Sequence, residues 1–178
     1  MTAVPHEPLD VEGFLIWADT QEDTYELVDG HAVVVEYGSV RHDTLASGLQ
    51  ALVAKASPCR VYGHRRGVRV SARVRRPDVL VICGSPTQDA VETDATYIAE
   101  ILSPATARTD LTEKVHEYKQ LPSIQQYLVL DPDVRQGYLF DRHELGWRVS
   151  EFTGGHIEFA GLGVDVDKLY QQVDTALI

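Results

Sequence analysis

One short run of apolar residues most limits the folds open to this chain of 178 residues. Residues 79–82 read Val-Leu-Val-Ile, without the apolar–polar alternation of a strand that faces water on one side. An uninterrupted run this short is typical of a strand covered on both faces by other elements. The sequence therefore predicts a central strand over 78–82, inside a sheet with further layers on either side.

A second buried strand is expected over 97–102, where Tyr-Ile-Ala-Glu-Ile-Leu is again mainly apolar. A helix over 110–121 and a strand over 126–130 follow it. Leu111, Val115 and Tyr118 would form the inner face of this helix at helical spacing. Strand, helix and strand in this order form a plausible βαβ crossover, which is right-handed in nearly all proteins.

The other elements follow from turn signals and periodicity. Asp10 begins a helix over 9–18 as its cap, and Asp29-Gly30 joins two strands as a hairpin. We expect a helix over 39–56, strands over 60–62, 68–74, 137–141, 147–152 and 156–159, a polar loop over 84–96 and a helical turn or two over 165–170. This order predicts an α/β or α+β fold, a mixed sheet flanked by helices with extra C-terminal strands, in one domain over 1–178.

The composition is that of a globular protein, with 44% hydrophobic and 24% charged residues. No apolar run approaches the roughly 20 residues of a membrane span, and the first residues lack the basic start and apolar stretch of a signal peptide. Cys59 and Cys83 have no short metal-ligand spacing. We therefore expect a cytoplasmic protein in which both cysteines are reduced, buried thiols; a disulfide between them is the less favoured alternative.

The net charge of −11 alone argues against a nucleic-acid partner, but the basic residues are unevenly distributed. Six of the 16 lysines and arginines fall within residues 65–76. Alternation over 68–74 predicts one strand with valines inward and arginines outward. The outward set could contact phosphates, or could be a solvated face or an edge protected against aggregation. The candidate phosphate ligands are Arg69, Arg73, Arg75 and Arg76.

Asp78 and Glu100 are candidate ligands for a divalent metal, because each lies at or within a buried strand. An ionised carboxylate in such a strand is costly unless it is paired or binds a cation. Mg²⁺ usually takes only one or two protein carboxylates, with water and substrate phosphate completing its shell. Glu100 paired with an arginine and Asp78 as an ordinary strand or turn start remain the structural alternatives.

Many metal nucleases carry a lysine two residues after the second acid, where this chain has Leu102. Lys114, on the following helix, is the candidate replacement because its flexible stem could reach the Glu100 site. Asp110 is expected as the N-cap of that helix, with Glu113 completing a capping-box-like pair. A solvated helix lysine is the alternative reading of Lys114.

Four motifs in fixed order resemble the Uma-type restriction endonuclease family, a bacterial branch of the PD-(D/E)XK superfamily. The resemblance covers about residues 9–160, and any one motif is loose while the four together are specific. They are Tyr-Glu-Leu-Val-Asp-Gly at 25–30, Arg-Pro-Asp-Val-Leu-Val at 76–81, Ala-Glu-Ile-Leu-Ser-Pro-Ala-Thr at 99–106 with Asp-Leu-Thr-Glu-Lys at 110–114, and Gln-Tyr-Leu-Val-Leu-Asp-Pro at 126–132.

The resemblance implies a restriction-endonuclease-like core and Mg²⁺- or Mn²⁺-dependent cleavage of DNA. It maps Asp78 and Glu100 onto the metal carboxylates, adds the backbone carbonyl of Ile101 as a ligand, and makes Lys114 the migrated lysine. Glu26 matches the acid of the first motif and becomes an additional metal or supporting carboxylate; in its strand it could equally face solvent. His42 stands where the family often has a histidine, although a cap or packing role explains it as well.

Two functional hypotheses follow. The first is a metal-dependent DNA endonuclease that acts through metal-activated water, and the second is a catalytically weak or silent nuclease-like module that binds nucleic acid or a protein. The complete Asp, Glu and Lys set favours the first; the acidic composition favours the second. RNA is an alternative substrate, since two carboxylates do not select the sugar, and a homodimer is expected only by analogy with duplex-cutting enzymes.

Overall fold

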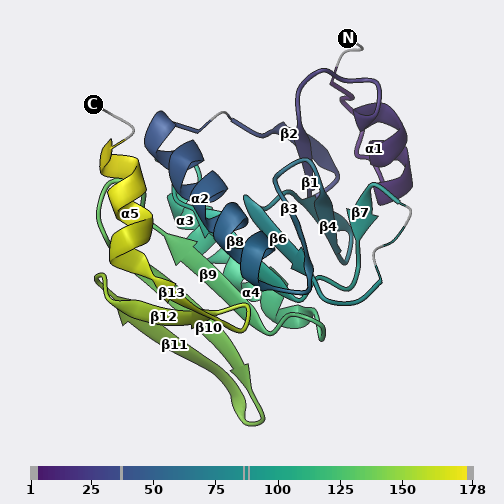
Figure 1. Cartoon of the computed structure of the whole chain (residues 1–178). Helices are drawn as coiled ribbons and strands as arrows, with labels where there is room; N and C mark the ends of the chain where they lie inside the picture. The colour runs from purple at the N-terminus through teal and green to yellow at the C-terminus, as the bar shows by residue number, and fades with distance from the viewer. Residues whose placement is uncertain (1–3, 37, 86, 88, 176–178) are drawn as a thin grey trace.

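The computed structural model describes residues 4–36, 38–85, 87 and 89–175. Its centre is a six-stranded sheet in the order β11-β10-β9-β8-β6-β3 (Figure 1). The strands are β3 (Arg60–Tyr62), β6 (Val79–Ile82), β8 (Tyr97–Ile101), β9 (Gln126–Leu130), β10 (Gly137–His143) and β11 (Gly146–Phe152). Only β8 and β9 run parallel; the other neighbours are antiparallel. The predicted mixed sheet and the strand–helix–strand crossover from β8 to β9 are confirmed.

Both faces of this sheet are covered at its centre, as the apolar run at 79–82 predicts, whereas the edge strand β11 is mostly exposed. All four residues of β6 are fully buried. Val79 and Val81 pack on the side of α2 (Val40–Ala56) and α5 (Val166–Thr175), whereas Leu80 and Ile82 pack on the side of α4 (Glu113–Gln120). Figure 1 shows α2 crossing one face with α5 beside it. Because successive side chains of a strand alternate, each strand residue can be assigned to one of these layers.

A second, five-stranded sheet lies beside the first and has the strand order β2-β1-β5-β4-β7. It contains the predicted hairpin of β1 (Tyr25–Val28) and β2 (His31–Val34), with a turn at Asp29-Gly30 in which both residues have positive φ. Helix α1 (Val11–Ala18) covers one face of that hairpin, capped by Asp10 as expected. The other face of the hairpin is turned towards the first sheet.

The strand predicted over 68–74 is wrong, because the chain reverses within it. It forms two antiparallel strands, β4 (Gly67–Val70) and β5 (Arg73–Arg75), with Val70 opposite Arg73. Ser71 has φ 57°, a left-handed conformation that non-glycine residues seldom adopt and that the alternating pattern gives no sign of. The reversal also removes the single outward row of arginines that we expected.

Four other boundaries differ from the sequence-based expectation. The loop over 84–96 contains a two-residue strand, β7 (Val91–Glu92), parallel to β4. The helix expected over 110–121 is two helices, α3 (Ala107–Leu111) and α4, that break at Thr112. In the C-terminal region, the predicted strand β12 (His156–Phe159) pairs with β13 (Leu162–Asp165), which was not predicted. Helix α5 is longer than the one or two helical turns expected there. Among the described residues there is no helix long and apolar enough to cross a membrane.

Cys59 and Cys83 form a disulfide, so the expectation of two reduced thiols is wrong for this structure. The reason lies in strand register: Arg60 of β3 opposes Ile82 of β6, and each cysteine is the next residue outward on its strand. Their Cα atoms are therefore only 4.4 Å apart, within the range that a disulfide spans. Sequence spacing alone cannot show such a pairing, since 24 residues separate the two cysteines.

This disulfide gives a prediction about stability. Closing a loop of this length restricts the unfolded chain and contributes about 3 kcal/mol in the chain-entropy description. Reductant should therefore lower the urea midpoint of the wild-type protein. The Cys83→Ser variant should show the lower midpoint with or without reductant, and equal midpoints for oxidised and reduced wild-type protein would contradict a disulfide that stabilises the fold.

Candidate active site

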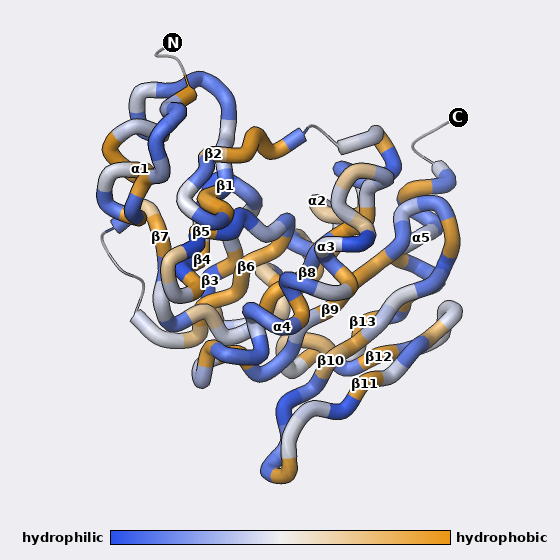
Figure 2. The backbone as a smooth tube through the Cα atoms, turned by 180° about the vertical axis from the view of Figure 1, so that it is seen from behind, coloured by the Kyte–Doolittle hydropathy of each residue, from blue (hydrophilic) through white to orange (hydrophobic). Residues whose placement is uncertain are grey.

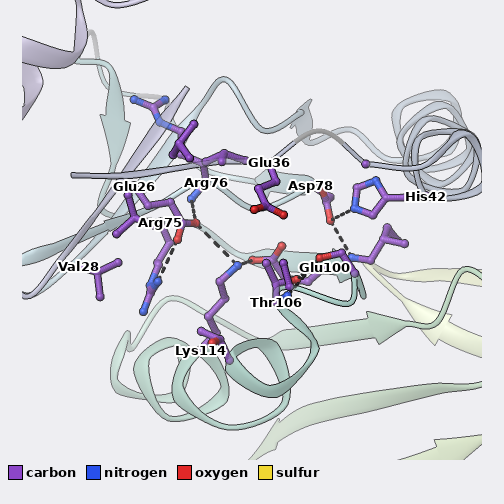
Figure 3. Close-up of a pocket in the computed structure, with 18 of the residues that line it drawn as sticks. Glu26, Val28, Glu36, His42, Arg75, Arg76, Asp78, Glu100, Thr106 and Lys114 are labelled. Carbon is purple, nitrogen blue, oxygen red and sulfur yellow. Dashed lines mark hydrogen bonds and ion pairs between the residues drawn. The ribbon is translucent and has the colours of Figure 1, made fainter. Parts of the chain in front are cut away.

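A cavity of about 380 Å³ lies between the β1–β2 hairpin, the ends of β6 and β8, and helices α3 and α4. Figure 3 shows charged side chains converging on it from the hairpin, from the ends of β6 and β8 and from α4, among them Glu26, Asp78, Glu100 and Lys114. The sequence-predicted residues brought together there are Glu26, His42, Arg75, Arg76, Asp78, Glu100, Ile101 and Lys114.

Glu100 is held inside the protein at the floor of this cavity. Alternation along β8 places it on the same side as Ile98, towards α4, while Ala99 and Ile101 face α2. Its side chain is 5% exposed, and its Oε1 accepts hydrogen bonds from Lys114 Nζ at 2.8 Å and the Tyr118 hydroxyl at 3.1 Å. The predicted partner of a structural Glu100 was an arginine; the actual partner is the site lysine.

Burial raises the pKa of Glu100, and the charge of Lys114 only partly opposes this rise. The neighbouring carboxylates of Asp110, Asp78 and Glu26 raise it further. The group is therefore surrounded by more negative charge than one lysine offsets, which is the electrostatic setting in which a cation is favoured.

Lys114 is buried, so the alternative of a solvated helix lysine is wrong. Its Nζ lies 2.8 Å from Glu100, 2.9 Å from Asp110 Oδ1 and 3.7 Å from Glu26 Oε1. Burial alone would lower the pKa of the lysine, but these three carboxylates outweigh burial and raise it. Lys114 is thus a fixed ammonium group at the centre of the carboxylate cluster.

Asp110 is a site residue that the sequence analysis did not recognise. It was expected as the N-cap of the following helix, but it lies within α3, 1% exposed, with its carboxylate directed at Lys114. Its Oδ2 accepts a bond from the Thr106 hydroxyl at 2.6 Å, and the Tyr127 hydroxyl donates to its carbonyl at 3.0 Å. The available signal was the spacing of four residues between an aspartate and a later lysine on a helix.

Asp78 is fixed at the start of β6 by contacts from two neighbouring elements. Its Oδ2 accepts a hydrogen bond from the backbone N–H of Ile101 at 2.8 Å and lies 3.3 Å from His42 Nε2. Gln50 of α2 donates to its carbonyl at 2.7 Å. The bond to Ile101 ties Asp78 to the strand that carries Glu100, so both predicted metal carboxylates line the same cavity.

Glu26 points into the cavity rather than into solvent, which removes the simplest alternative for it. Its Oε1 accepts a bond from the Arg76 N–H at 2.9 Å and its Oε2 from the Arg75 guanidinium at 2.9 Å. Burial raises the pKa of Glu26, but the charges of Lys114 and Arg75 outweigh burial and lower it. Both oxygens are engaged by the protein, and a role for Glu26 as a metal ligand stays a prediction.

The arginines of β4 and β5 are bound to carboxylates or carbonyl groups instead of forming an open basic stripe. Arg75 is 2% exposed and forms two hydrogen bonds of 2.7 Å with Glu117 of α4, so its predicted outward orientation is wrong. Arg73 also contacts Glu117 and binds Asp29, Arg69 lies 2.9 Å from Glu12, and Arg76 donates to the Tyr25 carbonyl at 2.9 Å. Phosphate binding by these side chains stays a prediction.

The donor set at the cavity suits a hard divalent cation. Within the ranges that the structure describes, no three acidic, histidine or cysteine side chains are grouped so that they could hold a metal ion. Mg²⁺, however, is commonly held by one or two carboxylates with water and substrate. Asp78 and Glu100 meet that count, and the excess of carboxylates over cations around Glu100 would be relieved by a bound cation.

The fold is shared with a protein of known structure. It superposes on a crystal structure from Anabaena variabilis, described as a "putative nuclease belonging to DUF820", with a TM-score of 0.74, 14% identity and coverage of 93% of this chain and 99% of that one. Residues 11–163 match the Uma2 family, described as "Putative restriction endonuclease". The chain therefore belongs to the Uma2 family.

Two proteins of Synechocystis are similar in sequence, and both are described as uncharacterized. One, slr1290, is 23% identical over 180 residues, 95% of each chain. The other, sll1609, is 30% identical over 116 residues, which are 60% of this chain and 65% of its own. These relatives place the chain in a group of proteins without naming a reaction.

The contacts of His42 predict that the stability of the protein depends on pH. Burial lowers the pKa of His42, but bonds and charges from Asp78 and Asp43 outweigh burial and raise the pKa to about 9. A histidine whose pKa is raised on folding stabilises the protein below its unfolded pKa of about 6.5, and this stability is lost as pH rises through about 9.

We therefore expect His42→Gln to lower the free energy of unfolding by roughly 1–2 kcal/mol at pH 6, allowing for partial solvent screening. The difference should shrink as the pH passes from about 6.5 to 9. Urea denaturation of both proteins at pH 6, 8 and 9.5 measures it. A difference independent of pH would show that the charge of His42 is not what stabilises the site.

Proposed function

We propose that this protein is a metal-dependent endonuclease that hydrolyses phosphodiester bonds in DNA, with Mg²⁺ or Mn²⁺ held by Asp78 and Glu100. The observation that supports it most is the position of Lys114, whose Nζ lies 2.8 Å from the Glu100 carboxylate inside the cavity. This is the contact expected if Lys114 replaces the lysine missing at position 102. Membership of a family described as "Putative restriction endonuclease" is consistent with it.

When bound, such a metal polarises a phosphoryl oxygen and lowers the pKa of a water molecule. The protein's own residues have separable tasks. Asp78 and Glu100 offer carboxylate oxygens, and the Ile101 N–H keeps Asp78 in register with Glu100. Lys114 holds a positive charge beside Glu100, where it would orient the attacking water or offset charge on the phosphate.

Asp110 is a positioning residue in this proposal. Lys114 lies between Glu100 and Asp110, and the Thr106 hydroxyl fixes the Asp110 carboxylate. Without Asp110, the ammonium group would be drawn towards Glu100 and Glu26, away from its present position between Glu100 and Asp110. Asp110 thus sets where the charge of Lys114 stands in the cavity.

The second candidate function is a nuclease-like module that binds nucleic acid or protein with little or no catalysis. The observation that favours it is the engagement of the nearby cations: Arg73 and Arg75 are paired with Glu117, and the net charge is −11. Action on RNA remains an alternative within the first proposal. A homodimer and the organisation of 1–178 as one domain also remain predictions.

The metal site can be tested by thermal stability. If Asp78 and Glu100 bind the cation, millimolar Mg²⁺ or Mn²⁺ should raise the melting temperature by roughly 3–8 °C, because a ligand of the native state stabilises it. Asp78→Asn and Glu100→Gln should each abolish the rise. Glu144→Gln, in the exposed β10–β11 turn, should keep it; a full rise in the Glu100 variant would remove Glu100 from the site.

Cleavage is tested on supercoiled, linear and single-stranded DNA and on RNA with Mn²⁺, beside Asp78→Asn. We expect Lys114→Ala to reduce the rate of cleavage about 100-fold or more. Because Lys114 offsets two buried carboxylates, this variant should also lose roughly 3–5 kcal/mol of stability. Asp110→Asn should fold more stably than Lys114→Ala and lose about tenfold in rate.

Folding of each variant is checked by circular dichroism at the assay temperature. Lys114→Arg, which keeps the charge, is the matched comparison for Lys114→Ala. Wild-type rates in folded Lys114→Ala would exclude the lysine from the reaction, and the absence of cleavage on all four substrates by wild-type protein would favour the binding module.

A further inference from the structure

An apolar surface faces the charged residues across the candidate active site. In the β1–β2 hairpin, Glu26 pairs with Val33, and paired residues of an antiparallel ladder share one face. Val28 lies two residues beyond Glu26, and the Val35 N–H donates to the Thr24 carbonyl, which continues the same register. We call Val28, Val33 and Val35 the valine wall; all three line the cavity.

The opposite face of the same hairpin is covered by α1 over most of its length, although Val34, which pairs with Tyr25 at the end of the hairpin, is 48% exposed. Leu27 is fully buried against α1, and Tyr25 and Ala32 pack in the same cluster. On the cavity face Val33 remains 47% exposed. Figure 2 shows a hydrophobic stretch that begins within β2 and ends at a hydrophilic residue shortly after it. Figure 3 places Val28 beside Glu26 on the side of the cavity away from Asp78 and His42. The wall thus belongs to the site and is not part of a core.

The cavity therefore offers two unlike surfaces to one ligand. The charged side consists of Asp78, Glu100 and Lys114. The two sides meet at Glu26, which shares the hairpin face of the valine wall and whose Oε1 lies 3.7 Å from Lys114 Nζ. A volume of about 380 Å³ is within the range of small-molecule sites. A nucleotide has the matching chemistry, with an apolar base face at one end and a phosphate at the other.

A paired duplex would not present that chemistry. Its base faces are stacked inside the helix, and its affinity comes mainly from lysine and arginine contacts with many phosphates. Arg69 and Arg73 on the neighbouring strands are paired with Glu12 and with Asp29 and Glu117. An unpaired strand exposes base faces and can place one beside its own phosphodiester.

We propose that the site takes an unpaired nucleotide, whose base packs on the valine wall while its phosphate lies over Asp78, Glu100 and Lys114. The substrate class is then single-stranded nucleic acid, or a single-stranded stretch within a duplex, rather than intact duplex. This inference rests on the proposed nuclease function and deepens it.

The test measures binding instead of cleavage, so that it is separable from catalysis. Binding is measured by fluorescence anisotropy in the presence of Ca²⁺, a hard cation with the same preference for oxygen ligands as Mg²⁺. The labelled ligands are 20-nucleotide single strands of DNA and RNA, the DNA duplex, and that duplex with a central unpaired bubble. The single strands and the bubble should bind at least fivefold more tightly than the duplex. The ratio of the DNA and RNA single strands shows which sugar is preferred.

Val33→Thr, which keeps the shape of the side chain but replaces one methyl group by a hydroxyl, should weaken single-strand binding roughly fivefold and leave duplex binding unchanged. Val149→Thr is its matched control, a valine of 51% exposure in β11, away from the cavity, and should bind as wild type does. Equal affinity for duplex and single strand, or an unaffected Val33→Thr, would overturn the unpaired-nucleotide inference while leaving the nuclease proposal standing. No binding of any nucleic acid would overturn both.

Discussion

The ion pair between Lys114 and Glu100 is the interaction on which the rest of the site depends. Two side chains, each about 95% buried, meet at 2.8 Å between a central strand and the helix that covers it. Either charge alone at this depth would be prohibitively costly, so each is tolerated because the other is present. The pair also fixes α4 against β8, which joins the packing of the sheet to the chemistry of the cavity.

The fold could be predicted where one residue pattern has one structural meaning. The apolar run at 79–82 led to the central strand, and Asp29-Gly30 led to the hairpin. The prediction failed at Ser71, where the backbone takes a positive φ inside an alternating run, and at Thr112, where a run of helical spacing breaks into two helices. It failed for Cys59 and Cys83 because a cross-strand neighbour is set by register, and register depends on the assembled sheet.

The candidate site shows the same limit. Asp78 and Glu100 were recognised because a carboxylate at or within an apolar strand is visible in the local sequence and is costly to bury without a partner. Asp110 was misread as a cap, since an aspartate at a helix start has a common local explanation. Arg75 was assigned to solvent by alternation, yet it is held by Glu117, a partner 42 residues later in the chain. Long-range partners of this kind leave no local trace.

Arg75 links the second sheet to helix α4, because it binds Glu26 on the hairpin and Glu117 on α4. Glu117 is three residues after Lys114, less than one helical turn, so both belong to one rigid segment. Helix α4 therefore connects the two sheets, through Glu117 to Arg75 of the second sheet and through Lys114 to Glu100 of the first. If it turns or lifts, the arginine link and the lysine at Glu100 are lost together, and the site opens as a unit instead of loosening residue by residue.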